Sequence, residues 1–200
     1  MSLFPFQDPI AFKVPDAEIL WYPNFIDIAQ SQAFFQQLLS EIPWQHDTIT
    51  VFGKKHLQPR LTALFGNEGK PYAYSDIVMQ PHPWTPLLTF LKEEIESVCD
   101  ERFTTVLLNQ YRNGQDSNGW HADNERELGR NPVIASLSFG AERMFHLQHN
   151  TIKEAKLKIN LTPGSLLIMK GSTQHYWKHQ IPKTAKPVGP RINLTFRILK

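Results

Sequence analysis

Two histidines and one aspartate in the second half of the chain have the residue types and spacing of a metal site. His121 and Asp123 lie two residues apart, so on an extended segment both side chains project from the same side and can reach one ion. His179 is the candidate for a third ligand, one of the eight histidines of the chain. The competing histidines of this half are His146, His149 and His175. Two imidazoles and one carboxylate form the ligand set of a non-heme Fe(II) centre, which leaves coordination positions open for a co-substrate and oxygen.

A strictly alternating segment near the end of the chain supplies a second set of polar groups. On a strand, Arg191, Asn193, Thr195 and Arg197 fall on one face. Polar side chains on a buried face need partners, and a bound anion would supply them. Guanidinium groups bind carboxylates in a two-pronged geometry, which suits a dicarboxylate co-substrate.

Length and composition place this chemistry in an ordinary globular protein. The chain has 200 residues, of which 41% are hydrophobic and 20% charged, and we expect a single domain. The net charge of +2 is compatible with a polyanionic partner but is not evidence for one. A single cysteine, Cys99, excludes an internal disulfide and fits a reducing compartment. The N-terminal residues do not read as a secretory signal and no segment has the length of a membrane span, so we expect a soluble, intracellular protein.

The elements that must position these residues change in type along the chain. Apolar residues at helical spacing predict a helix over residues 27–42 and a second that starts at Pro86. The stretch 44–83, rich in proline, glycine and aromatics, predicts strands and long loops. In the second half, short β-rich runs separated by turn residues predict a barrel or a jelly roll. Those runs are 104–110, 133–139, 144–147, 157–161, 165–169 and 192–198.

The motifs together resemble the AlkB family of Fe(II)/2-oxoglutarate-dependent dioxygenases, which demethylate alkylated nucleic acid. In chain order they are Asn109-Gln-Tyr111, His121-Ala-Asp123, Ala135-Ser-Leu-Ser-Phe139-Gly, Pro163-Gly-Ser-Leu-Leu-Ile-Met169, His179 and Arg191-x-Asn193-x-Thr195-x-Arg197. The resemblance covers roughly residues 44–199 and implies a mainly β protein with some α-helix. The expected fold is a double-stranded β-helix, or jelly roll, flanked by N-terminal helices and a nucleotide-recognition lid. We expect one AlkB-like domain over 1–200, with the N-terminal extension and lid in about 1–100 and the catalytic core in 101–200.

The resemblance also assigns roles to the motif residues. Fe(II) is expected on the catalytic residues His121, Asp123 and His179. The residues expected to bind 2-oxoglutarate are Asn109, Tyr111, Arg191, Asn193, Thr195 and Arg197, with the match of each arginine to a carboxylate left open. With O2, such an enzyme oxidises N1-methyladenine or N3-methylcytosine in DNA and releases formaldehyde, succinate and CO2, and ascorbate is expected to support the activity in vitro. A base inside a duplex cannot reach a buried iron, so it must be flipped out or come from a single strand.

The expected substrate contacts follow one subgroup of the family, that of the second mammalian AlkB homologue, which repairs duplex DNA. Val51 and Phe52 match a hairpin tip that wedges into the base stack, although core packing is the alternative for Phe52. Tyr74, within a segment that includes Tyr72 and Ser75, would stack on the flipped base opposite His121. The residues expected near the pocket are Arg60 and Glu125, of which Glu125 would reach a polar edge of the base.

Two departures from this subgroup weaken different expectations. Asn124 stands where an acidic residue is expected after the second ligand, so the subgroup's hydrogen-bond network near the pocket does not carry over at this position. The loop after His149 is short and carries lysines rather than an arginine-rich segment, so a preference for duplex over single-stranded DNA is a weaker expectation than the chemistry. Lysines that could bind phosphate, or merely be solvated, are Lys54, Lys55, Lys153, Lys156, Lys158, Lys183 and Lys186. The alternatives are an RNA demethylase, a protein hydroxylase with the same core, or a non-catalytic module that binds damaged DNA; we expect a monomer without a membrane partner.

Overall fold

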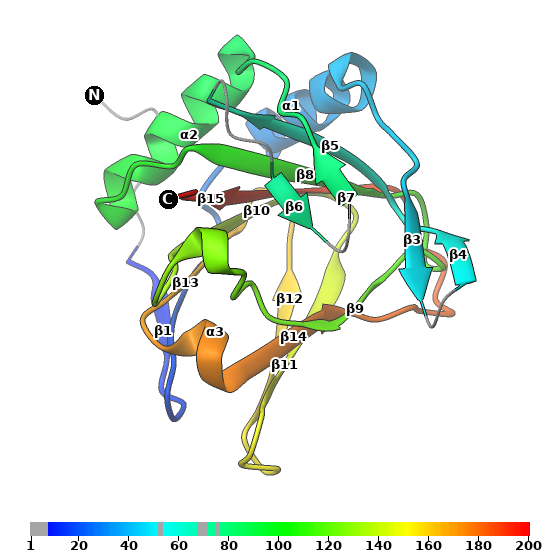
Figure 1. Ribbon diagram of the computed structural model, residues 1–200. Helices are drawn as coiled ribbons and strands as arrows, with labels where there is room; N and C mark the ends of the chain where they lie inside the picture. The colour runs from blue at the N-terminus through cyan, green and yellow to red at the C-terminus, as the bar shows by residue number, and fades with distance from the viewer. Residues whose placement is uncertain (1–7, 52–53, 68–71, 75–76) are drawn as a thin grey trace.

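The computed structural model describes residues 8–51, 54–67, 72–74 and 77–200, and it confirms a mainly β fold (Figure 1). Both predicted helices form, as α1 (Ile28–Glu41) and α2 (Pro86–Cys99). Each begins at a residue whose side chain accepts from free backbone N–H groups of the first turn. Asp27 accepts from Ala29 and Gln30, and Thr85 caps α2 next to the proline at its start.

The large sheet has seven strands, and every neighbouring pair in it is antiparallel. In spatial order they are β1 (Ile10–Phe12), β2 (Glu18–Tyr22), β13 (Leu166–Lys170), β10 (Ile134–Gly140), β15 (Arg191–Arg197), β8 (Thr105–Tyr111) and β5 (Leu61–Gly66). The sheet therefore takes strands from both halves of the chain, and β15 lies near its middle.

The small sheet faces it across the molecule and is also antiparallel (Figure 1). Its strands are β12 (Lys156–Leu161), β11 (Arg143–His149), β14 (Trp177–Ile181) and β9 (Asn118–His121). Two facing antiparallel sheets are the jelly-roll arrangement expected from the runs of short strands. A turn of 3-10 helix, η1 (Arg126–Leu128), and a short helix, α3 (Thr173–Tyr176), lie in the connections.

Two hairpins stand apart from these sheets, in the region expected to form the lid. β3 (Thr48–Val51) pairs with β4 (Lys54–Leu57), and β6 (Tyr72–Tyr74) pairs with β7 (Ile77–Met79). Of the predicted substrate residues, Phe52 and Ser75 lie outside the described residues. Val51, Tyr72 and Tyr74 lie on the hairpin strands, but their side chains belong to the part of the chain that is not described.

The core has two layers, one on each side of the large sheet. One layer fills the space between that sheet and the two long helices, and the other lies between the two sheets. β15 contributes Ile192, Leu194 and Phe196 to the helix-side layer, so its other face turns towards the space between the sheets. This alternation explains why a strand with four polar residues is buried along its whole length.

Glycine is required where the turn before β13 meets the start of α1. Gly164 has a φ of +77°, and a Cβ there would lie 2.3 Å from the carbonyl oxygen of Ile26. Its own carbonyl accepts from the backbone N–H of Ile26 at 3.0 Å. None of the helices formed by the described residues combines the length and apolar character that a membrane-spanning helix needs.

Candidate active site

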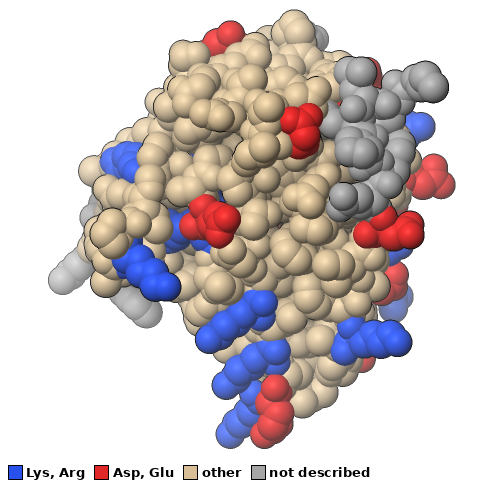
Figure 2. All heavy atoms as spheres, turned by 180° about the vertical axis from the view of Figure 1, so that it is seen from behind, with Lys and Arg blue, Asp and Glu red and all other residues tan. Residues whose placement is uncertain are grey.

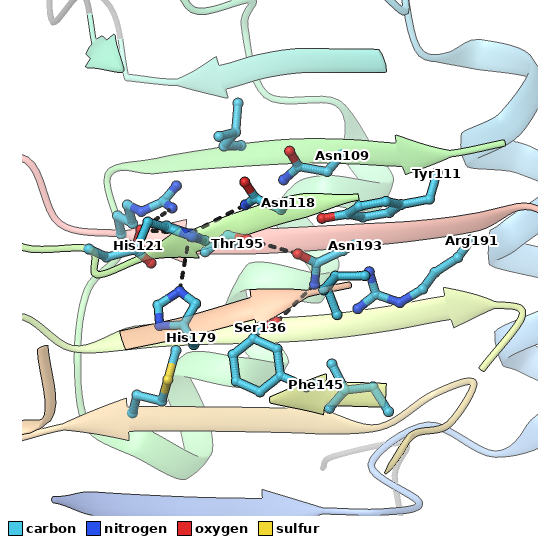
Figure 3. Close-up of a pocket in the computed structure, with 16 residues that line it drawn as sticks. Asn109, Tyr111, Asn118, His121, Ser136, Phe145, His179, Arg191, Asn193 and Thr195 are labelled. Carbon is cyan, nitrogen blue, oxygen red and sulfur yellow. Dashed lines mark hydrogen bonds and ion pairs between the residues drawn. The ribbon is translucent and has the colours of Figure 1, made fainter. Parts of the chain in front are cut away.

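The three predicted metal ligands meet in one place. His121 and His179 face each other on the paired strands β9 and β14, and Asp123 follows directly after β9. One ligand atom from each of the three lies within 4.8 Å of the others. The two imidazole Nε2 atoms are 3.1 Å apart, and Oδ1 of Asp123 is 3.9 Å from Nε2 of His121 (Figure 3). The donor set and its spacing fit a divalent metal ion held from one side, with the remaining positions open.

Neighbouring groups aim two of these ligands. Nδ1 of His121 lies 2.8 Å from the carbonyl oxygen of Gly119, which places the proton on Nδ1 and leaves the Nε2 lone pair for a metal. The backbone N–H of Asp123 donates to Oε1 of Gln174 at 2.9 Å. Oδ1 of Asp123 accepts from Arg197 at 2.9 Å, and both side chains are buried. The triad is therefore held in place by the protein itself.

The electrostatics of the pocket favour the protonation states that a metal needs. Burial and the proximity of His121 lower the pKa of His179 to about 3, and burial also lowers the pKa of His121. Burial opposes ionisation of Asp123, but Arg197 and the two histidines outweigh it and lower the pKa of Asp123 to about 2. Near neutral pH the site offers two neutral imidazoles and one carboxylate, so a cation displaces no proton when it binds.

The predicted co-substrate residues line the same pocket as the triad (Figure 3). Asn109 and Tyr111 come from β8, and the four polar residues of β15 stand beside them, with Arg191 opposite Tyr111 and Asn193 opposite Asn109. The apolar wall of the pocket consists of Leu107, Phe145, Leu161, Met169 and Ile181. The pocket therefore has a polar floor on the large sheet and apolar sides.

Arg191 is the clearest sign of an anionic ligand. The side chain is 1% exposed, and only its Nη2 donates within the described residues, to Oγ of Ser138 at 3.0 Å. Its Nε and Nη1 have no acceptor there. The guanidinium lies 5.2 Å from the centre of the Tyr111 ring, and burial lowers the pKa of Arg191 to about 10. Buried donors left unpaired cost roughly 1–3 kcal/mol each, so a carboxylate at this end of the pocket would satisfy them.

Comparison with known proteins identifies the family. The sequence pattern of the 2OG-Fe(II) oxygenase superfamily matches residues 18–197. Human DNA oxidative demethylase ALKBH2 is 37% identical to the chain over 179 residues, which cover 84% of this chain and 69% of that protein. The chain belongs to the AlkB family of 2OG-Fe(II) oxygenases.

Other AlkB-family relatives agree with this assignment. Bovine alpha-ketoglutarate-dependent dioxygenase alkB homolog 3 is 45% identical over 184 residues, which cover 88% of this chain. That identity is higher than the 37% to human ALKBH2, so the relation to the subgroup of the second homologue is not exclusive. The chain spans 64% of the length of the bovine alkB homolog 3 protein. A solved structure titled "The structure of OsALKBH1" shares the fold, with a TM-score of 0.68 at 14% identity over 95% of this chain and 99% of that one.

Two more predicted residues of this AlkB-family protein do not line the pocket themselves but lie next to residues that do. Arg60 is buried, and its Nε donates to Oδ1 of Asn109 at 2.7 Å. Glu125 is half-buried directly before η1, two residues after Asp123. Their expected contacts with a base remain predictions.

Several supporting residues of the AlkB-family site were not predicted from the sequence. Ser136 accepts from Asn193 at 2.8 Å and Ser138 accepts from Arg191, so the two serines of β10 support two polar residues of β15. Their alternation within the Ala135–Gly140 motif was a usable signal, because both fall on one face of a strand. Gln174, which fixes Asp123 from α3, gave no signal.

Arg143 was also missed, and it lies beside Tyr111, one of the residues that line the pocket. Its guanidinium donates to the carbonyl oxygens of Asn113, Asp116 and Pro182 at 3.2, 2.9 and 2.6 Å. It also lies 5.6 Å from the centre of the Tyr111 ring, so that Tyr111 has guanidinium groups of Arg143 and Arg191 close to it. A lone arginine at the start of a strand has no pattern from which this role could be predicted.

Proposed function

We propose that the protein is an Fe(II)- and 2-oxoglutarate-dependent dioxygenase that oxidatively demethylates alkylated DNA bases, acting on N1-methyladenine and N3-methylcytosine. The observation that carries this proposal is the position of the triad in the same pocket as the unpaired donors of Arg191. Membership of the AlkB family supports the reaction type, and a relative named DNA oxidative demethylase supports the substrate class.

The residues that would hold the iron are His121, Asp123 and His179, whose donor set fits the ion. When bound, Fe(II) supplies the oxidising chemistry in which O2 and 2-oxoglutarate are converted to succinate and CO2 while the N-methyl group leaves the base as formaldehyde. Gln174 holds the backbone N–H of Asp123 and Arg197 holds its carboxylate, and together they would keep this ligand aimed at the ion. In assays, ascorbate would keep the iron reduced.

The two arginines of β15 have different duties in this proposal. Arg197 already donates to Asp123, so it stands at the metal end of the pocket. Arg191 has two unpaired donors and lies beside Tyr111, so we assign it to the carboxylate of 2-oxoglutarate that is distant from the metal. Asn109, Asn193 and Thr195 complete the polar floor. The apolar side walls exclude water, which strengthens the attraction between the guanidinium and the carboxylate.

The methylated base would enter on the side of His121. The His121 side chain is 23% exposed, whereas that of Asp123 is 2% exposed, so the first ligand faces the opening of the site. We propose that the base is flipped into this opening and stacked between His121 and Tyr74, with Tyr72, Ser75 and Glu125 at its rim. In the same proposal, Val51 and Phe52 fill the gap that the flipped base leaves in a duplex.

Backbone phosphates would be met by lysines outside the pocket. Figure 2 shows Lys and Arg side chains gathered on the lower part of the face behind Figure 1, at the level of the β11–β12 hairpin. Lysines of this hairpin are Lys153, Lys156 and Lys158. Phosphate contacts of this kind are independent of sequence and weaken with salt. We propose that the protein acts as a monomer and prefers duplex over single-stranded DNA.

The test is a 2-oxoglutarate-dependent formaldehyde and base-repair assay on matched methylated oligonucleotides, as single-stranded DNA, duplex DNA and RNA. We expect turnover on methylated DNA, and a selective loss of duplex activity in Phe52→Ala. Equal losses of Phe52→Ala on single and double strands would contradict the wedge. Turnover only on RNA, or only on a protein side chain, would mean that this molecule and not DNA is the substrate. Binding of damaged DNA without any turnover would mean that the protein is a non-catalytic binding module.

A further inference from the structure

Arg60 lies at the junction between the lid and the large sheet. The β3–β4 hairpin ends at Leu57 and β5 begins at Leu61, so Arg60 is the last residue before the sheet. Its side chain is 4% exposed although it carries a charge. A buried guanidinium must be paired. Its Nε donates to Oδ1 of Asn109 at 2.7 Å.

The bond matters for the site because its acceptor, Asn109, lines the pocket. Asn109 lies on β8, opposite Thr62 of β5 on one side and opposite Asn193 of β15 on the other. Its side chain lines the pocket, and among the described residues nothing accepts from its amide nitrogen. Figure 3 shows that nitrogen on the side of the other lining residues and the amide oxygen facing away from them.

The guanidinium of Arg60 selects one of the two orientations that the side-chain amide of Asn109 can take. An asparagine amide can turn by 180° and present either an acceptor or a donor to a ligand. Because Arg60 is a cationic donor, it bonds well only to the oxygen, and a turned amide would place N–H groups against it. Asn109 is therefore locked with its donor towards the pocket, where the oxygens of 2-oxoglutarate are acceptors.

Backbone contacts hold Arg60 itself in place. The carbonyl oxygen of Pro59 accepts from Ser117 at 2.9 Å, and Nη1 of Arg60 lies 3.4 Å from the carbonyl oxygen of Ser117. The backbone N–H of Gln58 donates to the carbonyl oxygen of Asp47 at 2.8 Å. These bonds join the end of the β3–β4 hairpin to the residue before β9. They fix the guanidinium of Arg60 next to Asn109, so that it is not free to move towards a ligand in the opening of the site.

We propose that Arg60 is a positioning residue of the co-substrate site, which orients the amide of Asn109 for 2-oxoglutarate, rather than a contact to the methylated base. The inference rests on the proposed function, because it takes 2-oxoglutarate as the occupant of the pocket. It assigns Arg60 to the co-substrate instead of the base, and it makes the affinity for 2-oxoglutarate dependent on a residue that does not line the pocket.

Calorimetric titration of 2-oxoglutarate into the full chain loaded with Mn(II), which replaces Fe(II) without turnover, tests the proposal. Arg60→Gln should weaken the binding of 2-oxoglutarate about 10-fold, in line with the loss of a charge-assisted hydrogen bond. Asn109→Ala should weaken it similarly, and the double variant Arg60→Gln/Asn109→Ala should bind no more weakly than Asn109→Ala alone. If Arg60 has only a structural role, the two effects multiply or Arg60→Gln binds like the wild type, and either result overturns the proposal.

Two further variants separate orientation from folding. Arg112→Gln is the matched control, because Arg112 pairs with Asp116 rather than with Asn109. This variant should bind 2-oxoglutarate like the wild type. Asn109→Asp keeps an acceptor for Arg60 but replaces the donor in the pocket by a second oxygen, so it should fold and still lose at least about 10-fold in affinity. Binding by Asn109→Asp at the wild-type level overturns the proposal even if Arg60→Gln fails to fold. Failure of the wild type to bind 2-oxoglutarate would instead overturn the proposed function.

Discussion

The carboxylate of Asp123 faces two cations, the guanidinium of Arg197 and the metal ion expected between Asp123, His121 and His179. Asp123→Asn keeps an oxygen for Arg197 and removes the charge, so the fold should persist while metal binding fails. We expect the affinity for Mn(II), measured by calorimetry, to drop at least about 100-fold, since a lost ligand costs more than the 10–100-fold of a lost outer partner. Asp116→Asn is the control, because Asp116 pairs with Arg112 instead. Tight metal binding by Asp123→Asn would show that the triad is not the metal site.

His179 gives the metal-free protein a stability that depends on pH. An unfolded histidine takes up a proton below about pH 6.5, whereas in the folded protein burial and His121 lower the pKa of His179 to about 3. Between these values the unfolded state binds more protons, so the free energy of unfolding falls as the pH is lowered, by up to about 1.4 kcal/mol per pH unit for this group. Urea titrations between pH 6.5 and 4 should show the decline, and His179→Gln should make it shallower. An equal slope in that variant would mean that His179 titrates normally.

The sequence predicted the triad and the polar residues of β15, which line one pocket, and missed the side chains that hold these residues in place. The triad and the polar residues of β15 are unusual residue types for a buried strand region. The alternation of polar and apolar residues along β15 showed that its polar side chains share one face. Gln174 and Arg143 act through single contacts across the fold, and nothing local in the sequence distinguishes them from surface residues. The bond between Arg60 and Asn109 joins the residue before β5 to the neighbouring strand β8, and that pairing is not visible before the sheet order is known.

Among the elements, strands with both faces buried were the easiest to predict. β10 and β15 are continuous β-rich runs, and both appear within a residue of their expected bounds. β9, β14 and the N-terminal strands β1 and β2 were missed, because short strands with mixed burial resemble loops in a sequence. Yet the pairing of β9 with β14 brings His121 opposite His179. The two strands that bring the histidines together were therefore among those that the hydrophobic pattern of the sequence did not predict.

The turn before β13 is the element whose geometry is most sharply constrained. Gly164→Ala should destabilise the protein by more than about 2 kcal/mol, because of its positive φ and the contact with the carbonyl oxygen of Ile26. Gly119→Ala is the matched control, since a Cβ at that position meets nothing within 4 Å, and its effect should stay within about 1 kcal/mol. Chemical denaturation of both variants checks this. Equal stability of the two would contradict the close packing of this turn against the start of α1.

For the whole molecule, the two sheets form one ligand-binding body, because the pocket takes residues from both. Metal and 2-oxoglutarate should therefore stabilise the folded chain as a unit. A ligand whose free concentration is about 100 times its dissociation constant adds about 2.7 kcal/mol to the free energy of unfolding. This raises Tm by several degrees in a protein of this size. Thermal unfolding with Mn(II) and 2-oxoglutarate, together and separately, measures the effect. An unchanged Tm with both present would argue that the pocket does not bind them.

The measurement that tests the central claim most directly is the stoichiometry of turnover on one single-stranded DNA oligonucleotide that carries N3-methylcytosine. With Fe(II), ascorbate, O2 and 2-oxoglutarate, the wild type should form formaldehyde and repaired cytosine in equal amounts and at least as much succinate, and Asp123→Asn should form none of them. Succinate without formaldehyde would mean that the iron and 2-oxoglutarate site serves another substrate. No succinate from metal-loaded wild type on any methylated oligonucleotide would contradict the account.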